Sequence, residues 1–345
     1  SSNPWDVRLS TMFHMSNDSG LFGTEPAEDT LPLYEAKMFW HFDHRYATYA
    51  GATQANLNAG ILPQLTKEEK RDPRTQATPR YWVPEFDTLM RLVPLDNKER
   101  EELLRQAKEA QLQHLREKAP EWFIVFRDIT RSINERTAVF TLLPRVAVSN
   151  KAPLVCLPSH SPEQAACFLG SVNSLVFDYV TRQKIGGTSL NFFIVKQLPV
   201  LPPDAYSISD VRFITPRVTE LIYTSWDIAP FAQSVGYTGE PFVWDEGRRS
   251  QIRAELDAYY ARLYGLSRDD LRYILDPKEM HGQDYPSETF RVLKEREIKQ
   301  YGEYRTERLV LEAWDRQAAV EIGAGAPEEV AEAATVLPST SRHGL

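Results

Sequence analysis

The stretch Ser161–Gly187, SPEQAACFLGSVNSLVFDYVTRQKIGG, predicts a long amphipathic helix. Ser161 is a favoured N-cap residue, Pro162 occupies the favoured first helical position, and Gln164 completes a capping box. One face must lie against a sheet or a core, since apolar side chains recur at steps of three and four residues for about five turns. They are Ala165, Phe168, Leu169, Val172, Leu175, Val176, Tyr179 and Val180.

The segment after this helix predicts a stop and then a strand. Gly186 and Gly187 are expected to end the helix, because only glycine readily adopts the left-handed conformation of a C-cap. The apolar run 192–195, FFIV, then predicts a strand. The prolines after the run would end that strand.

Between the glycines and the apolar run, the sequence favours a loop that contacts phosphate. Thr188 and Ser189 carry hydroxyls, and Lys184 and Lys196 flank them. Exposed backbone N–H groups and lysines are typical phosphate contacts in proteins that bind nucleic acid. The alternative is a purely structural turn, since many α/β proteins place glycine at such a position.

Further strands are expected in the first half of the chain. The apolar runs 121–129, 136–149 and 152–158 each predict a strand. The aromatic-rich segment 31–50 suits strands or a short buried segment. Together with the long helix, these runs predict a mixed α/β fold.

Helices are expected on both sides of this region. A charged helix is predicted from the N-cap residue Asn97 up to Pro120. Ser267 and Asp270 form a second capping box in a helical C-terminal region. The low-complexity residues 323–345 are expected to be disordered.

Composition indicates a soluble protein of the cytoplasm. The chain has 345 residues, of which 42% are apolar, and no run approaches the ~18 apolar residues that span a bilayer. Its first residues lack the basic and apolar regions of a signal peptide. Cys156 and Cys167 are too few for a disulfide framework or a four-cysteine zinc site, and they fit a reducing compartment as small buried hydrophobes.

Charge is unevenly distributed along the chain. The net charge is −8, and residues 211–345 carry 17 basic against 23 acidic residues, a net of −6. Within residues 127–196 the balance reverses, with eight basic against four acidic residues. The basic patch suits phosphate contacts, and the alternative is ordinary solvated charge.

Several long segments resemble one family of DNA-modifying enzymes. The stretch 169–203, LGSVNSLVFDYVTRQKIGGTSLNFFIVKQLPVLPP, resembles the closing segment of target-recognition domains in adenine-specific DNA methyltransferases. These are the fused type IIG restriction-modification enzymes, including the methylases of the DISARM and BREX phage-defence systems, and more distantly the type I specificity subunits. Segments 3–22 and 31–49 resemble the region directly after their catalytic domain, and 253–275 and 301–315 resemble their C-terminal helices.

The resemblance implies an α/β (α+β) target-recognition domain with a helical C-terminal domain. Residues 1–30 would connect to a catalytic domain that this chain lacks, and 31–210 would recognise the target. Residues 211–322 would form the helical domain, with the disordered tail after it. These helices are acidic, so phosphate contacts from them are expected only through local groups such as Arg248, Arg249 and Arg305.

Catalytic and cofactor motifs of the family are missing. Such enzymes use a glycine-bearing loop for S-adenosylmethionine and an Asn/Asp-Pro-Pro-aromatic loop for the flipped adenine. The nearest match, SNPW at Ser2–Trp5, lacks the second proline and a preceding strand. We therefore expect no cofactor and no catalytic residue in this chain, with S-adenosylmethionine bound elsewhere in the full-length enzyme.

Candidate DNA contacts come from the basic patch, the hydroxyl-bearing loop and the segment HFDHRY, 41–46. HFDHRY also offers His41, Asp43 and His44 as metal ligands, but their spacing is not that of a helical zinc pair. The carboxylates and lysine of DPKEM, 276–280, are expected in a solvated loop and not in a nuclease site. The predicted DNA contacts are Arg127, Arg131, Arg136, Arg145, Lys151, Arg182, Lys184, Thr188, Ser189, Lys196, His41, His44 and Arg45.

The function implied by the resemblance is sequence-specific recognition of double-stranded DNA for adenine methylation. Side chains would read base edges in the major groove and phosphate contacts would fix the register. The expected partners are double-stranded DNA, a methyltransferase catalytic domain and other defence-system subunits, with no membrane. The alternative is a protein-interaction subunit of a phage-defence complex that touches DNA weakly.

Overall fold

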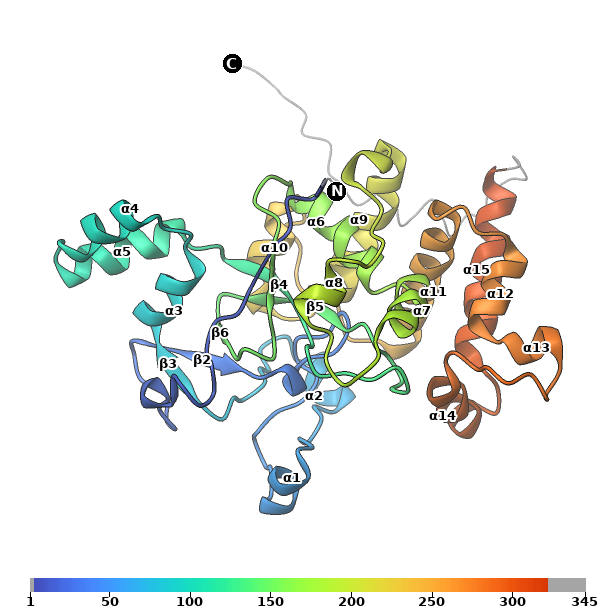
Figure 1. The fold of residues 1–345 in the computed structure, drawn as a ribbon, viewed down its shortest axis with the longest axis horizontal. Coiled ribbons are helices and arrows are strands. Elements are labelled where there is room, and N and C mark those ends of the chain that lie inside the picture. The colour runs from blue at the N-terminus through green and yellow to red at the C-terminus, as the bar shows by residue number, and fades with distance from the viewer. Residues whose placement is uncertain (1–2, 322–345) are drawn as a thin grey trace.

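The computed structural model describes residues 3–321, and all strands of that part lie in its first half (Figure 1). From Pro162 onward, the described residues form helices and connecting loops. This confirms a mixed α/β protein with a helical C-terminal region. The segment 323–345, predicted to be disordered, lies outside the described residues. No helix of the described part is long and apolar enough to cross a membrane.

A four-stranded antiparallel sheet separates two hydrophobic cores. Ile124 and Phe126 on one face belong to the core that includes the first long helix, whereas Phe123 and Val125 on the other face belong to the second core. Because both faces are covered, these strands read as continuous apolar runs in the sequence. The strand order is β1 (Arg8–Ser10), β7 (Leu154–Cys156), β4 (Trp122–Phe126) and β5 (Phe140–Pro144).

The N-terminal residues are part of this fold. Strand β1 pairs with β7, and Trp5 is buried in the first core, so the segment predicted as a connector contributes a strand and a core residue. A second, three-stranded sheet packs in the other core. It has the order β3 (Trp82–Pro84), β2 (Thr30–Tyr34) and β6 (Ala147–Val148), in which β2 and β6 are parallel.

The prediction of one continuous helix from Asn97 to Pro120 is wrong. It divides into two helices, because the side chain of Gln111 donates to the carbonyl oxygens of Leu104 and Gln106 at the turn between them. The N-cap is Asp96, one residue earlier than predicted. The helices of this part are α1 (Gln54–Ala59), α2 (Lys67–Arg71), α3 (Glu85–Leu92), α4 (Asn97–Leu104) and α5 (Lys108–Lys118).

The long helix after Ser161 also divides, into α6 (Pro162–Val172) and α7 (Leu175–Lys184). The predicted capping box is confirmed, since Ser161 accepts from the backbone N–H of Gln164 and the Gln164 side chain accepts in return. At the break, the amide of Asn173 bonds the backbone N–H and C=O of Phe140, both at 3.1 Å. The helix is interrupted where this polar side chain ties it to strand β5.

Two predictions for the next segment are wrong. Helix α7 ends at an extended Ile185, and neither Gly186 nor Gly187 has a positive φ, so no left-handed glycine ends it. The apolar run is the short helix α8 (Phe192–Val195) and not a strand, because the Asn191 side chain caps it by accepting from the N–H of Ile194 at 3.1 Å.

The C-terminal helices pack against the first half of the chain. The first core contains Leu169 and Phe177 together with Ile214 and Tyr260, so it continues across the boundary expected after residue 210. The capping box at Ser267 is confirmed. The helices are α9 (Ile208–Ile222), α10 (Ala229–Ser234), α11 (Glu246–Leu263), α12 (Arg268–Leu275), α13 (Pro277–His281), α14 (Arg291–Tyr301) and α15 (Arg305–Glu321). The 3-10 helices among the described residues are Ser19–Leu21, Ala36–Met38, Pro203–Ala205 and Trp226–Ile228.

Candidate functional site

The predicted DNA contacts separate into buried and exposed side chains. Arg45 is fully buried. Its guanidinium donates to the carbonyl oxygens of Lys70, Thr75 and Thr224 at 2.8 to 2.9 Å. These bonds connect the HFDHRY segment to α2, to the loop that follows α2 and to the residues just after α9. Burial therefore removes Arg45 from the surface that DNA can reach.

His44 is equally enclosed. Its Nε2 lies 2.9 Å from the Ser225 hydroxyl and 3.1 Å from Oδ1 of Asp227. Burial would raise the pKa of Asp227, but His44 and Ser225 outweigh it and lower the pKa to about 2. His44 thus holds the loop after α9 to the N-terminal half.

Four of the predicted arginines bind main-chain carbonyls. Arg182 pairs with Asp178 and donates to the carbonyl oxygens of Ser132, Glu135 and Thr289. The other three have the same kind of partner: Arg127 bonds Phe39, Arg136 bonds Asn173, and Arg145 bonds Ala119 and Pro120. Arg136 and Arg182 are buried, and Arg127 and Arg145 are half-buried.

Two of the exposed candidates, Arg131 and Thr188, lie on two loops that pair through their backbones, 128–134 and 186–191, which we call the loop pair. The exposed Lys151, Lys184 and Lys196 lie outside these two loops. The N–H of Thr130 donates to the carbonyl of Thr188 at 3.1 Å, and the N–H of Leu190 donates to that of Asp128 at 2.7 Å. Asp128 also accepts from the Ser189 hydroxyl and from Lys151. The loop pair is therefore held in a fixed arrangement.

Exposed side chains of three kinds surround the loop pair. Thr188 is exposed, and the hydroxyl makes no hydrogen bond to the described residues. Arg131, Lys184 and Lys196 are exposed and form no ion pair within residues 3–321. The apolar side chains Ile129, Ile133 and Phe193 are 53%, 69% and 75% exposed.

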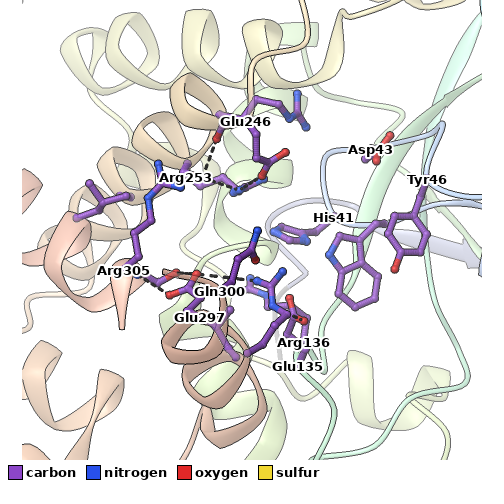
Figure 2. A pocket seen from close by; sticks show the side chains of 18 of the residues that line it. His41, Asp43, Tyr46, Glu135, Arg136, Glu246, Arg253, Glu297, Gln300 and Arg305 are labelled. Carbon is purple, nitrogen blue, oxygen red and sulfur yellow. Dashed lines mark hydrogen bonds and ion pairs between the residues drawn. The ribbon is translucent and has the colours of Figure 1, made fainter. Parts of the chain in front are cut away.

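A separate pocket of about 460 Å³ lies between the N-terminal half and the C-terminal helices (Figure 2). Its wall is formed by Trp40–Tyr46, by Glu135 and Arg136, by α11, and by the facing ends of α14 and α15. Figure 2 shows His41, Arg136, Arg253, Glu297 and Arg305 around this space. The pocket thus joins segments that lie more than 250 residues apart in the sequence.

Ion pairs neutralise most carboxylates of this wall. Lys70 pairs with Asp43 at 2.6 Å, and Arg253 with Glu246 at 2.9 Å. Arg296 is 3.1 Å from Glu135 and 3.9 Å from Glu297.

Two further groups of the pocket have strongly shifted pKa values. Burial, reinforced by the surrounding arginines, holds the pKa of His41 well below its usual range, so the imidazole is neutral at pH 7. Burial also raises the pKa of Asp257 to about 6, despite the N–H of Leu175 that donates to it at 2.7 Å. Such shifts are typical of functional pockets, although structural networks also produce them.

The side chains of HFDHRY point in different directions and do not form a metal site. Asp43 faces Lys70, His44 faces Ser225, and His41 points into the pocket. In residues 3–321, no three His, Cys, Asp or Glu side chains are close enough to hold a metal ion.

Sequence reasoning identified only part of the pocket. It singled out His41, Arg136, Arg249 and Arg305, but as separate candidates for phosphate contact. A signal for α11 was present in the four-residue spacing of Arg249 and Arg253, which puts both on one helix face.

Comparisons with protein-family models, with curated proteins and with solved structures find no match for this chain.

Proposed function

We propose that this chain recognises a double-stranded DNA sequence on behalf of an adenine-specific DNA methyltransferase of a restriction-modification or phage-defence system in the cytoplasm. The catalytic domain and its S-adenosylmethionine site would belong to the full-length enzyme or to a partner. The observation that carries the proposal is the loop pair, which presents the cation Arg131, a hydroxyl and apolar side chains, with Lys184 directly before its second loop. The segments that resemble target-recognition domains include its second loop.

The side chains of the loop pair suit the two parts of DNA recognition. Unpaired exposed cations such as Arg131 and Lys184 can neutralise phosphates without first breaking an ion pair. A free hydroxyl can bond a base edge, and an apolar side chain can contact the methyl group of thymine. Phosphate contacts would fix the register, and Thr188 with Ile129 or Ile133 would read the sequence.

The buried arginine Arg182 would act as a positioning residue for this surface. It bonds the carbonyl oxygens of Ser132 and Glu135, within and directly after the first loop. Asp178, its ion-pair partner, accepts from the N–H of Thr137 at 2.8 Å. Binding residues on loops need such support from a rigid scaffold.

Salt-dependent binding to duplex DNA tests the proposal. The variant Arg131→Ala/Lys184→Ala should bind more weakly to all duplexes, and its log affinity against log salt should flatten by roughly one unit per lost phosphate contact. The matched control is Arg100→Ala/Lys108→Ala, which removes two exposed cations from α4 and α5 without touching the loop pair. An unchanged slope in the first variant, or an equal loss in the control, would contradict the proposal. A stable complex with a helicase or nuclease in the absence of DNA would favour an interaction subunit instead.

A further inference from the structure

We infer that the pocket between HFDHRY and helices α11, α14 and α15 binds a nucleotide through its phosphate group. This goes beyond the proposed function, because the pocket is a different surface from the loop pair and its ligand need not be duplex DNA. The inference depends on three properties of the wall: its unpaired cations, its unsatisfied buried donors and its size.

Cations exceed carboxylates in the pocket wall. Seven Lys and Arg side chains line it against five Asp and Glu side chains. Within residues 3–321, Lys67, Arg136, Arg249 and Arg305 have no carboxylate at ion-pair distance, whereas every lining carboxylate except Asp257 is paired. The unpaired positive charge calls for an anionic ligand.

Several buried donors of the same wall have no hydrogen-bond partner among the described residues. They are Nε of Arg136, Nε of Arg249 and Nε1 of Trp244, and these three side chains are 5%, 3% and 5% exposed. Buried polar groups in folded proteins are nearly always satisfied, so an unsatisfied set at one pocket points to an absent acceptor. Nδ1 of the neutral His41 is also unpartnered there.

A phosphate group supplies acceptors of the right kind. Its oxygens can accept from several N–H groups at once, and guanidinium groups match them in a bidentate geometry. Arg305 enters from the start of α15 and Arg249 from α11, whereas Arg136 comes from the N-terminal half. The phosphate would therefore bridge the C-terminal helices and the N-terminal half.

The volume calls for more than a phosphate ion. Sites for small molecules measure roughly 300–1,000 Å³, and this pocket of about 460 Å³ lies within that range. Trp40 and Tyr46 supply aromatic surface in the same wall, and they are stacked on each other with ring centroids 5.4 Å apart. A nucleoside attached to the phosphate suits this lining. It can come from a free nucleotide or from one nucleotide unit of a DNA strand.

Calorimetric titration with four probes tests the inference: AMP, adenosine, inorganic phosphate and a short single-stranded oligonucleotide. AMP should bind, and adenosine should bind at least tenfold more weakly because it lacks the phosphate. The oligonucleotide is titrated into the Arg131→Ala/Lys184→Ala protein, so that the loop pair does not contribute. Binding of the oligonucleotide as well as AMP would then identify a strand as a source, whereas binding of AMP alone would identify a free nucleotide. If no phosphate-bearing probe binds, or if inorganic phosphate binds as tightly as AMP, the inference is wrong.

A variant links the binding to the pocket. Arg305→Ala removes a half-buried cation at the pocket mouth and should weaken AMP binding at least tenfold with an unchanged melting temperature. The matched control Lys299→Ala removes an exposed cation of α14 that does not line the pocket, and AMP should bind to it as to the unmodified protein. Equal AMP affinity in both variants would overturn the assignment. Arg131 and Lys184 do not line the pocket, so the Arg131→Ala/Lys184→Ala protein should bind AMP normally. The DNA proposal and the nucleotide inference can therefore fail independently.

Discussion

Asp178 and Arg182 lie one turn apart on α7 and form a buried ion pair, with 2.9 Å between Oδ2 and Nε and side-chain exposures of 0% and 5%. Each side chain of the pair has further hydrogen-bond partners. Asp178 also accepts from the backbone N–H of Thr137, and Arg182 donates to the carbonyl oxygens of Ser132 and Glu135. The pair therefore connects helix α7 to residues 132–137. These residues belong to the first loop of the loop pair or directly follow it.

Removing Asp178 should strongly destabilise the protein. Asp178→Ala leaves the buried Arg182 without its counter-ion, which typically costs about 3–5 kcal/mol in the free energy of unfolding. The control is Asp315→Ala, which breaks an exposed pair with Arg268 and should cost about 0–1 kcal/mol. Urea denaturation of both variants measures the difference. Similar losses in the two would show that the buried pair has no special role in holding the fold.

Gly187, after α7, and Gly302, after α14, should respond differently to a branched side chain. A Cβ on Gly187 meets no heavy atom within 4 Å and its φ is not positive, so Gly187→Val should cost less than about 0.5 kcal/mol. Gly302 ends α14 in the left-handed conformation at φ +79°, and Gly302→Val should cost about 1–2 kcal/mol. Thermal melting compares them. If Gly187→Val lost more stability than Gly302→Val, the left-handed C-cap predicted from the sequence at Gly187 would be supported instead.

The neighbouring hydroxyls should separate binding from stability. Thr188→Ala removes an exposed hydroxyl and should lower DNA affinity by about 1 kcal/mol with little effect on melting. Ser189→Ala removes the bond to Asp128 and should lower the free energy of unfolding by about 1 kcal/mol. Both quantities are measured for both variants. A Thr188→Ala protein that binds DNA like the unmodified one would show that the Thr188 hydroxyl does not contact DNA.

Asp257 should make the protein less stable as the pH rises. Its folded pKa of about 6 lies above the unfolded value near 3.9, so the folded state holds the proton longer than the unfolded state. The free energy of unfolding should therefore fall between about pH 4 and pH 6, by on the order of 3 kcal/mol from this group, and then level off.

Asp257→Asn tests the sign of this effect. The amide oxygen can still accept from Leu175, but the group no longer titrates. The stability of the variant relative to the unmodified protein should increase from pH 4 to pH 7. A constant difference over that range would show that Asp257 has an ordinary pKa.

Sequence patterns predicted the local features of this fold better than the distant ones. The capping boxes at Ser161 and Ser267 use residues three apart, so the sequence contains all that they need. The break of the long helix depends on Asn173 bonding Phe140, a contact across 33 residues that no periodicity reveals. The apolar run 192–195 was misassigned because a short run fits a strand and a helix equally well.

The candidate site shows the same limit. Charge counting indicated a basic patch, but it could not show that Arg136 and Arg182 bind main-chain carbonyls in the interior. The pocket joins Arg136, Arg249 and Arg305 from three distant segments, and only the tertiary packing brings them together.

Selection from a randomised duplex library tests the central claim most directly. The chain is incubated with the library, the bound duplexes are recovered over several rounds, and their sequences are compared with the input. Sequence-specific recognition predicts enrichment of one short motif by the unmodified protein and weaker enrichment of that motif by Thr188→Ala, with the Arg100→Ala/Lys108→Ala control unaffected. Recovery of duplexes with the base composition of the input, from a protein that melts cooperatively, would contradict the claim.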